Sequence, residues 1–193
     1  VRKSLDIACV GPDRIQAFLM IHFEANLRSL IGEHPGVLYW PCDPACPGSF
    51  VAHDIDHEWV FMRAWEPESE PLESFDDARC ESIVRAAMQG GEDIPLRIRT
   101  VGPWVMTSQI AERYRDKRIF LAGDAAHRFP PSGGLGLNTG VQDVHNLVWK
   151  IALQESTTTP CGFLDSYEDE RRPVAGYNAE QSLANAIRLY EVP

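Results

Sequence analysis

Residues 123–140 read Gly-Asp-Ala-Ala-His-Arg-Phe-Pro-Pro-Ser-Gly-Gly-Leu-Gly-Leu-Asn-Thr-Gly. A buried-type strand over residues 118–124 places an acidic side chain, Asp124, at its C-terminal end. The stiff Pro130-Pro131 step then fixes the direction of the chain, and the glycines that follow let bare backbone approach a ligand closely. A helix begins after Gly136, and its N-terminus favours a negatively charged group. This order of features is typical of a cofactor site.

The helix after this loop carries one apolar stripe. Its members lie three, four, three and one residues apart, at Val141, Val144, Val148, Ile151 and Ala152. Such spacing places side chains on a single helical face, so the stripe is predicted to lie in the core. A break over residues 156–160 separates this helix from a second helical segment over residues 163–190. We expect Arg171-Arg172-Pro173 to kink or restart that second helix, because proline lacks the backbone N–H.

The part of the chain before the loop has the pattern of a sheet with covering helices. Short runs rich in aromatic and β-branched residues alternate with turn signals, and two other segments have helical spacing. Strands are predicted at residues 15–23, 49–53 and 58–65 and as a pair at 96–101 and 105–110, and helices at 24–31 and 78–89. The expected fold class is therefore α+β or α/β, with a mixed, largely antiparallel sheet and covering helices, followed by the strand, loop and helices described above.

The composition favours a folded, acidic protein. The 193 residues are 44% hydrophobic, which is enough for one large domain or two small ones. A formal net charge of -10 argues against nucleic acid or an anionic membrane as the main partner. The 5 cysteines are scattered, so we expect reduced thiols and a cytoplasmic location. No run of about 18 uncharged apolar residues predicts a membrane helix.

Several short motifs occur in a fixed order around the loop. They are Gly-Asp-Ala-Ala-His, Pro-Pro, Gly-Gly and Gly-Leu-Asn-Thr-Gly, then Asp143, Asn146, Leu147, Trp149 and Lys150, then Leu164-Asp165-Ser166-Tyr167 and Glu170-Arg171-Arg172-Pro173. Together they resemble the flavin-binding Gly-Asp motif and the segment after it in class A flavoprotein monooxygenases, the aromatic hydroxylases with the p-hydroxybenzoate hydroxylase fold. The resemblance is strong across residues 104–175.

The resemblance implies FAD as the cofactor. It implies that Asp124 bonds a ribityl hydroxyl and that Pro131 lies beside the reactive face of the isoalloxazine. The resemblance also implies that backbone groups contact the pyrimidine edge of the flavin at Gly133, Gly134, Gly136, Leu137 and Asn138. It further implies that NADPH or NADH is the reductant and that dioxygen supplies the oxygen for a phenolic or polyketide-like ring. No catalytic residue and no metal site are identified from the sequence.

The chain also departs from the family pattern. It contains no Gly-x-Gly-x-x-Gly after a first strand, which is the motif that cradles a dinucleotide pyrophosphate. The first residues, Val1-Arg2-Lys3-Ser4-Leu5, resemble those that follow the family's Asp-Gly motif. We therefore expect the C-terminal portion of such an enzyme, for which the missing N-terminal Rossmann segment would be a partner. Residues 1–115 would form the middle, substrate-binding sheet domain and residues 116–193 the C-terminal part of the FAD-binding domain.

Two alternatives remain open for the function. The chain could be a truncated, non-catalytic remnant that keeps the fold around the sheet. It could also come from a related flavoprotein that performs epoxidation or halogenation with the same cofactor loop. An upstream reading frame with the missing motifs would exclude the first alternative, and product analysis would exclude the second.

Other residues allow both a structural and a functional interpretation. His127 is a candidate general base, but a buried, hydrogen-bonded histidine is favoured. Trp149-Lys150 is interpreted as helix packing with a lysine amine that reaches solvent. Cys42 and Cys46 have no Cys-x-x-Cys spacing, so a redox role is disfavoured.

Two further clusters lie in the sheet region. The cluster of His53, Asp54, Asp56 and His57 could be drawn as a metal site. Strand alternation, however, separates the two histidines from the two aspartates, which favours a polar hairpin end. The large aromatic residues of the region either line an aromatic-substrate pocket or pack the core, and the sequence does not decide between these for Trp40, Phe61, Trp65 and Trp104.

Overall fold

The computed structural model describes residues 2–33 and 35–190. Val1 of the N-terminal segment Val1-Arg2-Lys3-Ser4-Leu5 therefore lies outside the described residues. The chain divides into two compact units. We call residues 16–105 the sheet unit, and residues 1–15 together with 106–193 the loop–helix unit. Residues 1–15 and 106–115, which the sequence groups with the sheet domain, belong to the loop–helix unit. The reason is that β7 (Gln109–Ala111) pairs with both β1 (Cys9–Val10) and β10 (His127–Arg128).

The sheet unit is built on one five-stranded sheet in the order β3-β4-β5-β2-β6. The pairs β3–β4, β4–β5 and β5–β2 are antiparallel, and β5 lies near the centre. The strands are β2 (Gln16–Glu24), β3 (Leu38–Tyr39), β4 (Ser49–Asp54), β5 (Glu58–Ala64) and β6 (Arg97–Met106). The unit also contains α1 (Arg28–Ile31), η2 (Leu72–Ser74) and α2 (Asp77–Met88).

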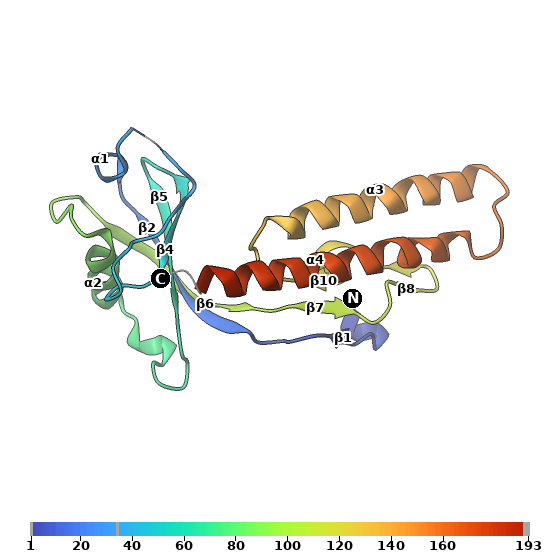
Figure 1. Ribbon diagram of the computed structural model, residues 1–193, viewed down its shortest axis with the longest axis horizontal. Helices are drawn as coiled ribbons and strands as arrows, with labels where there is room; N and C mark the ends of the chain where they lie inside the picture. Colours follow the sequence, from blue (N-terminus) through green and yellow to red (C-terminus); the bar gives the residue numbers. More distant parts are fainter. Residues whose placement is uncertain (1, 34, 191–193) are drawn as a thin grey trace. The chain divides into compact units, whose positions relative to one another are not determined.

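The core of this unit lies between the sheet and α2 (Figure 1). Alternate residues of β2 point to the helix, so Leu19, Ile21 and Phe23 are buried against Cys80 and Val84. The helix begins at an N-cap aspartate, Asp76, whose carboxylate accepts a hydrogen bond from the Arg79 N–H at 2.8 Å. A period-two pattern on the strand and a capped amphipathic helix are therefore enough to form this layer.

Two expectations for the sheet unit are wrong. The predicted strand pair at 96–101 and 105–110 is a single long strand, β6, followed by the short β7. A terminal position in the sheet allows β6 to include Pro103, because an edge strand tolerates a missing N–H donor. The predicted helix at 24–31 is only α1, since β2 continues to Glu24 and the N–H groups of Ala25 and Leu27 then bond the His57 and Ile55 carbonyls.

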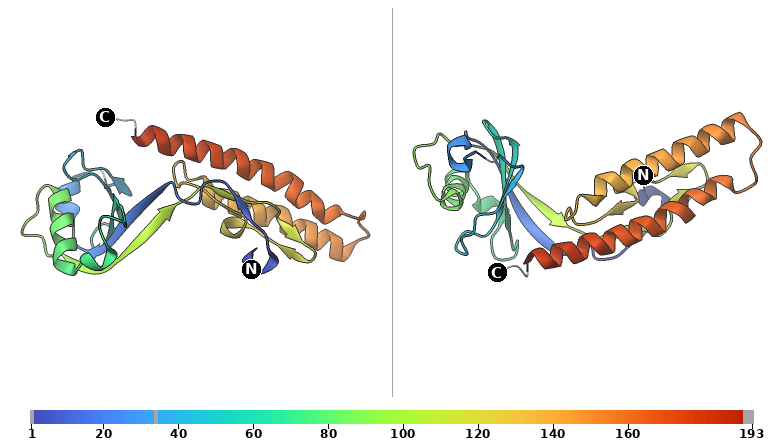
Figure 2. Two further views of the ribbon diagram at one scale, coloured as in Figure 1. Left: turned by 90° about the horizontal axis from the view of Figure 1, so that it is seen from below. Right: turned by 45° about the horizontal axis from the view of Figure 1, so that its top comes forward.

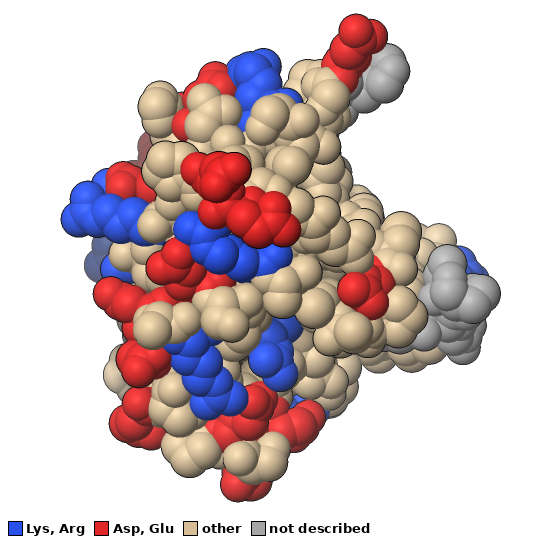
Figure 3. Space-filling view, turned by 90° about the vertical axis from the view of Figure 1, so that its left-hand side faces the viewer, with Lys and Arg blue, Asp and Glu red and all other residues tan. Residues whose placement is uncertain are grey.

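Charged side chains of both signs are interleaved on the face of the molecule that Figure 3 brings forward. The sheet unit contains ion pairs such as Arg63–Glu70 at 3.1 Å, Arg79–Glu70 at 2.6 Å and Arg85–Glu81 at 2.7 Å. Pairs of this kind at a surface each contribute about 0–1 kcal/mol.

The loop–helix unit combines small sheets with a helical hairpin. Its sheets are β1-β7-β10 and the pair of β8 (Arg115–Asp116) and β9 (Ile119–Phe120). Its helical elements are η1 (Arg2–Leu5), η3 (Gly123–Ala125), α3 (Leu135–Ser156), η4 (Phe163–Asp165) and α4 (Ser166–Tyr190). The helices α3 and α4 lie side by side in all three views (Figure 1, Figure 2). The buried hydroxyl of Tyr167 on α4 donates to the Leu121 carbonyl at 2.7 Å and ties the hairpin to the small sheets.

Two expectations for this unit also differ from the structure. Only Ile119–Phe120 of the predicted strand at 118–124 forms a strand, β9, paired with β8, and Gly123 turns the chain with a φ of +55°. The second helix does not restart at Pro173 but continues through it as α4. Residues on both sides of the proline are anchored, since Tyr167 bonds Leu121 and the Asn178 amide donates to Thr139 Oγ1 at 2.9 Å.

The expected mixed fold class, with a sheet, covering helices and a strand–loop–helix segment, is confirmed. Within the described ranges, no helix combines the length and the apolar character needed to span a bilayer.

Candidate functional site

The Gly-Asp turn is η3, a single turn at Gly123–Ala125. The Ala126 N–H donates to the Gly123 carbonyl at 2.8 Å and closes the turn. Gly123 has a positive φ of 55°, which suits glycine because it has no Cβ to clash with the backbone. Asp124 is exposed, and among the residues that the structure describes no side chain bonds its carboxylate. The turn therefore presents an acidic group that a ligand can reach.

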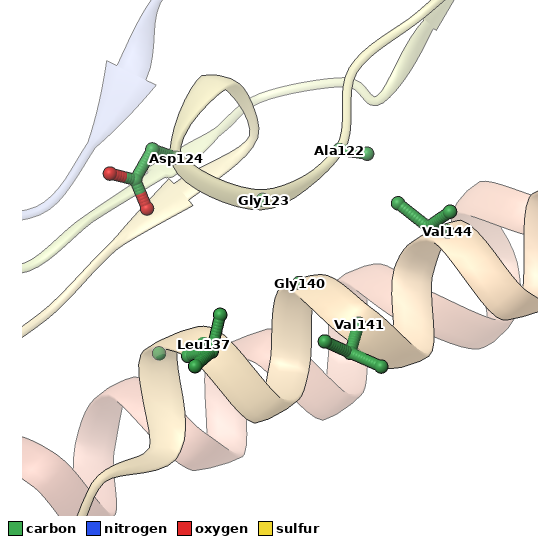
Figure 4. A pocket seen from close by; sticks show the side chains of 8 residues that line it. Ala122, Gly123, Asp124, Leu137, Gly140, Val141 and Val144 are labelled. Atoms are coloured by element: carbon green, nitrogen blue, oxygen red, sulfur yellow. The ribbon is translucent and has the colours of Figure 1, made fainter.

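The turn lies directly against α3 because two glycines face each other. A Cβ placed on Gly140 would lie 3.3 Å from the Gly123 Cα, which is closer than nearly all real contacts of this kind. Figure 4 shows Gly123 opposite Gly140, with Asp124 beside them. The backbone of the turn and the backbone of the helix thus meet without an intervening side chain.

The start of α3 has features of an anion-binding helix end. Its N-cap is Gly134, with a φ of 66°, and no side chain caps the helix. The first turn contains no acidic residue, so its free N–H groups and the helix dipole favour a negative group. A Cβ on Gly134 would meet no atom within 4 Å, so this backbone faces open space. Pro131 precedes it at the surface, and the Pro131 carbonyl accepts a bond from the Gly134 N–H at 2.9 Å.

The turn and the helix enclose an open hollow of about 390 Å³. Three of the seven residues expected to bind the cofactor line it, namely Asp124, Gly136 and Leu137. Figure 4 shows Asp124 and Leu137 on its two sides. The rest of its lining consists of small and aliphatic residues, Ala122, Gly123, Gly140, Val141 and Val144. Gly133 instead lines a second hollow of about 350 Å³, with Asn185 and Arg188 of α4. Pro131, Gly134 and Asn138 line neither, and the Asn138 amide donates to the Gly134 carbonyl at 2.8 Å.

A buried polar network lies beneath the turn, centred on Asp143. This residue is 0% exposed. Its Oδ2 accepts from the Gly123 N–H at 3.2 Å and lies 2.7 Å from His127 Nε2, while its Oδ1 accepts from Arg171 Nε at 2.9 Å. Burial alone would raise the pKa of Asp143, but the bonds from His127, Arg171 and Gly123 outweigh it and hold the pKa below its ordinary value.

From the sequence, Asp143 is only one position of the motif series, and this network is not predicted. One signal was present, because Asp143 follows Gly140 by three residues and so shares its helical face. The preferred interpretation of His127 is confirmed: it is buried, bonded to Asp143 and stacked on Phe129 at 5.3 Å between ring centroids.

The expectation that the apolar stripe of α3 lies in the core is wrong. Val141 is 61% exposed, Val144 51% and Val148 58%, whereas the opposite stripe of the helix packs on α4. Lys150, expected to reach solvent, is 1% exposed. Its Nζ donates to Ser166 Oγ at 2.7 Å and pairs with Glu170 at 2.8 Å. The helix is oriented by these polar contacts, and the described residues leave its apolar stripe uncovered.

The aromatic candidates of the sheet unit do not form one pocket. Phe61 and Trp65 belong to the core between the sheet and α2. Trp40 is exposed, and Trp104 lies beside Phe18 with ring centroids 5.4 Å apart. For Phe61 and Trp65, packing is therefore the correct interpretation.

The polar cluster at the β4–β5 hairpin is a hairpin end, as expected. The carboxylate of Asp56 accepts two bonds from the Arg28 guanidinium at 2.7 Å, and the Asp54 carboxylate accepts from the Asp56 N–H at 2.9 Å. Across the described part of the chain, no three histidine, cysteine or acidic side chains gather as metal ligands. All five cysteines are free thiols, including Cys42 and Cys46.

Comparison with known proteins gives consistent matches over nearly the whole chain. Residues 1–182 match the family described as an FAD binding domain. The chain is 36% identical over 182 positions to tetracenomycin B2 monooxygenase-dioxygenase of Streptomyces olivaceus, covering 94% of this chain and 33% of that protein. It is 38% identical over 194 positions to 4-methyl-5-nitrocatechol 5-monooxygenase of Burkholderia sp, covering 97% and 35% of the two chains.

A solved structure gives the same result. The ternary complex of aklavinone-11 hydroxylase with FAD and aklavinone matches with a TM-score of 0.85 at 31% identity, over 97% of this chain and 35% of that chain. The chain spans about a third of the length of the curated relatives it matches.

Proposed function

The chain belongs to the FAD binding domain family, and from this premise we propose that the whole protein is an FAD-dependent monooxygenase that hydroxylates an aromatic substrate of phenolic or polyketide type. One observation carries the proposal. An exposed acidic turn, bare glycine backbone and an uncapped helix N-terminus are brought together around one side of the loop–helix unit. The relatives are named for monooxygenation and hydroxylation of aromatic compounds, which supports the same conclusion.

The residues present fit FAD. Asp124 has a free, exposed carboxylate that can accept a hydrogen bond from a ribityl hydroxyl. Gly134 would meet nothing within 4 Å if it carried a Cβ, so its backbone is open to a flat ring. The N–H groups at the start of α3 favour negative charge at the pyrimidine edge of a flavin. Pro131, Gly133, Gly136, Leu137 and Asn138 complete the proposed contact set.

FAD, when bound, supplies electron transfer from the reductant and the activation of dioxygen. The chain's own groups would bind and orient it. Asp124 and the α3 N-terminus would hold polar parts of the cofactor, and Leu137 and Val141 give the hollow an apolar wall.

The remaining parts of the proposal concern the whole protein. The reductant is NADH or NADPH, and the oxygen comes from dioxygen. The sheet unit would bind the aromatic substrate, and the loop–helix unit would form the C-terminal part of the FAD domain. A partner segment outside these 193 residues would cover the exposed stripe of α3. The five free thiols support a cytoplasmic location, where disulfides are rare.

The test is product analysis with the whole protein. The purified protein is expected to carry FAD, to oxidise NADH or NADPH faster when a phenol or polycyclic aromatic polyketide is added, and to insert one atom of isotopically labelled dioxygen into the product. Absence of bound flavin, or a product without label, would refute the proposal. A halogenated product formed only with halide present would assign the protein to the halogenating class instead.

A further inference from the structure

Asp143 links α3 to three other elements of the loop–helix unit. Its two carboxylate oxygens bond the Gly123 N–H of η3, the His127 ring of β10 and the Arg171 guanidinium of α4. His127 is 2% exposed and Arg171 is 9% exposed, so these two partners of the carboxylate lie away from water. The carboxylate therefore connects the turn that carries Asp124 to the framework that supports it.

We propose that Asp143 is a positioning residue that fixes the Gly-Asp turn on α3 and so directs the Asp124 carboxylate toward the flavin, an inference that rests on the proposed function. Gly123 directly precedes Asp124, and its backbone touches α3 at Gly140 without a side chain between them. A contact between two bare backbones provides no side-chain attachment of the turn to α3. The hydrogen bond from the Gly123 N–H to Asp143, about one helical turn further along α3, provides one.

The position requires a carboxylate and not merely a polar group of the same size. Oδ1 faces an N–H donor of Arg171, and Oδ2 faces the N–H donor of Gly123. An asparagine has one accepting oxygen, and the charged Arg171 guanidinium is the stronger donor to it. The amide NH₂ would then face the Gly123 N–H and could not accept its hydrogen bond. The bonds also keep the carboxyl charged, because they hold its pKa below the ordinary value despite burial.

A neighbouring cluster provides a control that separates a weaker α3–α4 contact from release of the Gly-Asp turn. Glu170 of α4 accepts from the Asn146 amide at 2.7 Å and pairs with Lys150 at 2.8 Å. It joins the same two helices as the Asp143–Arg171 pair, but it has no bond to the Gly-Asp turn. Glu170→Gln should therefore weaken helix contacts without releasing the turn, whereas Asp143→Asn should release it.

The experiment measures amide hydrogen exchange by NMR in the flavin-free chain, for wild type, Asp143→Asn and Glu170→Gln. Exchange at Gly123 and Asp124 is compared with exchange at core amides of α4, so that a general loss of stability cancels. Asp143→Asn is expected to raise this ratio about tenfold, the effect of losing one hydrogen bond to a charged group. Glu170→Gln should leave the ratio unchanged.

An unchanged ratio in Asp143→Asn, or an equal rise in both variants, would overturn the proposal. Wild type alone is also decisive if Asp143→Asn does not fold. The Gly123 amide must then be protected although its turn is at the surface, and free exchange there would contradict the inference.

A titration with FAD, followed by visible absorption, separates this inference from the proposed function. Weaker binding to Asp143→Asn than to Glu170→Gln and wild type would support the inference, and equal binding to all three proteins would exclude a role toward the flavin. If the wild-type chain does not bind FAD, the proposed cofactor site fails in this chain, while the exchange ratios still decide whether Asp143 fixes the turn.

Discussion

The two faces of α3 reverse the usual arrangement of an amphipathic helix. The face toward α4, which we call the buried face, carries Thr139, Asp143 and Lys150. The opposite face, which we call the open face, carries Leu137, Val141, Val144, Val148 and Ile151, all exposed. Both sets follow helical spacing, so periodicity alone does not tell which of them is covered. Which face is covered depends on the element that packs against the helix. Here that element is α4, which presents polar groups to α3.

The buried face is stable because the side chains of Thr139, Asp143 and Lys150 each have hydrogen-bond partners. Thr139 Oγ1 donates to the Leu135 carbonyl at 2.7 Å, Lys150 bonds Ser166 and Glu170, and Asp143 has three contacts. Buried polar groups are tolerated when they are hydrogen-bonded and are costly when they are not. The open face has no comparable constraint within the described residues. Substitutions on the two faces should therefore have very different effects.

The largest effect is expected for Arg171→Met. The change keeps the length of the side chain but leaves the buried Asp143 carboxylate without its cationic partner. Breaking a buried ion pair in this way should lower the free energy of unfolding by about 3 kcal/mol. Urea unfolding of the 193-residue chain measures it.

The matched control is the adjacent Arg172→Met. Within the described residues, the Arg172 Nε donates to the neutral Ala111 carbonyl alone, at 3.0 Å, so its loss should cost about 1 kcal/mol. Equal costs for the two arginines would show that the Asp143 charge does not dominate the buried face.

The second prediction concerns Asp124, whose substitution should affect flavin binding but not folding stability. Asp124 lies on the side of the open face, and Asp124→Ala removes a proposed bond to FAD worth about 1.5–3 kcal/mol, or roughly 10- to 100-fold in affinity. Because Asp124 is exposed, stability without flavin should change by less than about 0.5 kcal/mol.

Flavin titration and urea unfolding of the same variant measure the two quantities. Glu180→Ala, which removes an exposed acidic group from the middle of α4 and away from the hollow, should change neither quantity appreciably. A stability loss in Asp124→Ala without weaker flavin binding would place Asp124 with the structural residues.

The pH dependence of stability should reveal the charge of the buried face. The folded-state pKa of Asp143 is lowered, so its contribution to stability is complete above its ordinary pKa of 3.8 and is lost as the pH falls through the folded value. The loss should be smaller than that caused by Arg171→Met, because protonation neutralises the carboxylate and does not leave it unpaired.

Urea unfolding at a series of acidic pH values tests this expectation. The stability difference between wild type and Asp143→Asn should narrow as the pH falls below 3.8. The pKa of Glu170 is also lowered, by its bonds from Lys150 and Asn146, but this carboxylate is exposed and screened. The curve for Glu170→Gln should stay nearly parallel to wild type, and parallel curves for Asp143→Asn as well would contradict the assignment.

Elements defined by local pattern were predictable from the sequence. Alternation and turn signals placed β2, β4 and β5 within one or two residues, and helical spacing with its flanking signals did the same for α2. The glycine- and proline-rich loop also indicated the start of α3. The bounds of these elements are determined by residues close to them in the sequence.

The features that failed depend on contacts between distant residues. Asp143 meets Gly123 and Arg171 across 20 and 28 positions, and these bonds turn the polar side of α3 inward. The single long strand β6 depends on its edge position, which only the assembled sheet defines. Of the candidate site, the sequence located the loop and Asp124, while the individual flavin contacts remain predictions.

A smaller effect is expected at the start of α3. Gly134 has a φ of +66° and open space around a Cβ, so Gly134→Ala should cost about 1 kcal/mol from backbone strain alone. Gly136 has no positive φ, and a Cβ there would be 3.9 Å from the Phe129 ring, so Gly136→Ala should be neutral or slightly stabilising. Thermal unfolding of the two variants measures the difference. Equal stabilities would mean that Gly134 does not hold the left-handed conformation in solution.

The smallest effect is expected on the open face itself. Val148→Ser replaces an aliphatic side chain that is 58% exposed in this structure, so the free energy of unfolding of the 193-residue chain should change by less than about 0.5 kcal/mol. If a segment of the whole protein covers this face, as proposed above, the same substitution there should cost about 1–2 kcal/mol, because it then exchanges a buried aliphatic group for a hydroxyl. Val51→Ser in the sheet unit, far along the chain from α3, controls for a general sensitivity of the whole protein. A loss of stability that Val148→Ser causes in the whole protein but not in the 193-residue chain would establish that another segment covers the open face. Equally small losses in both proteins would mean that the open face of α3 stays in contact with water.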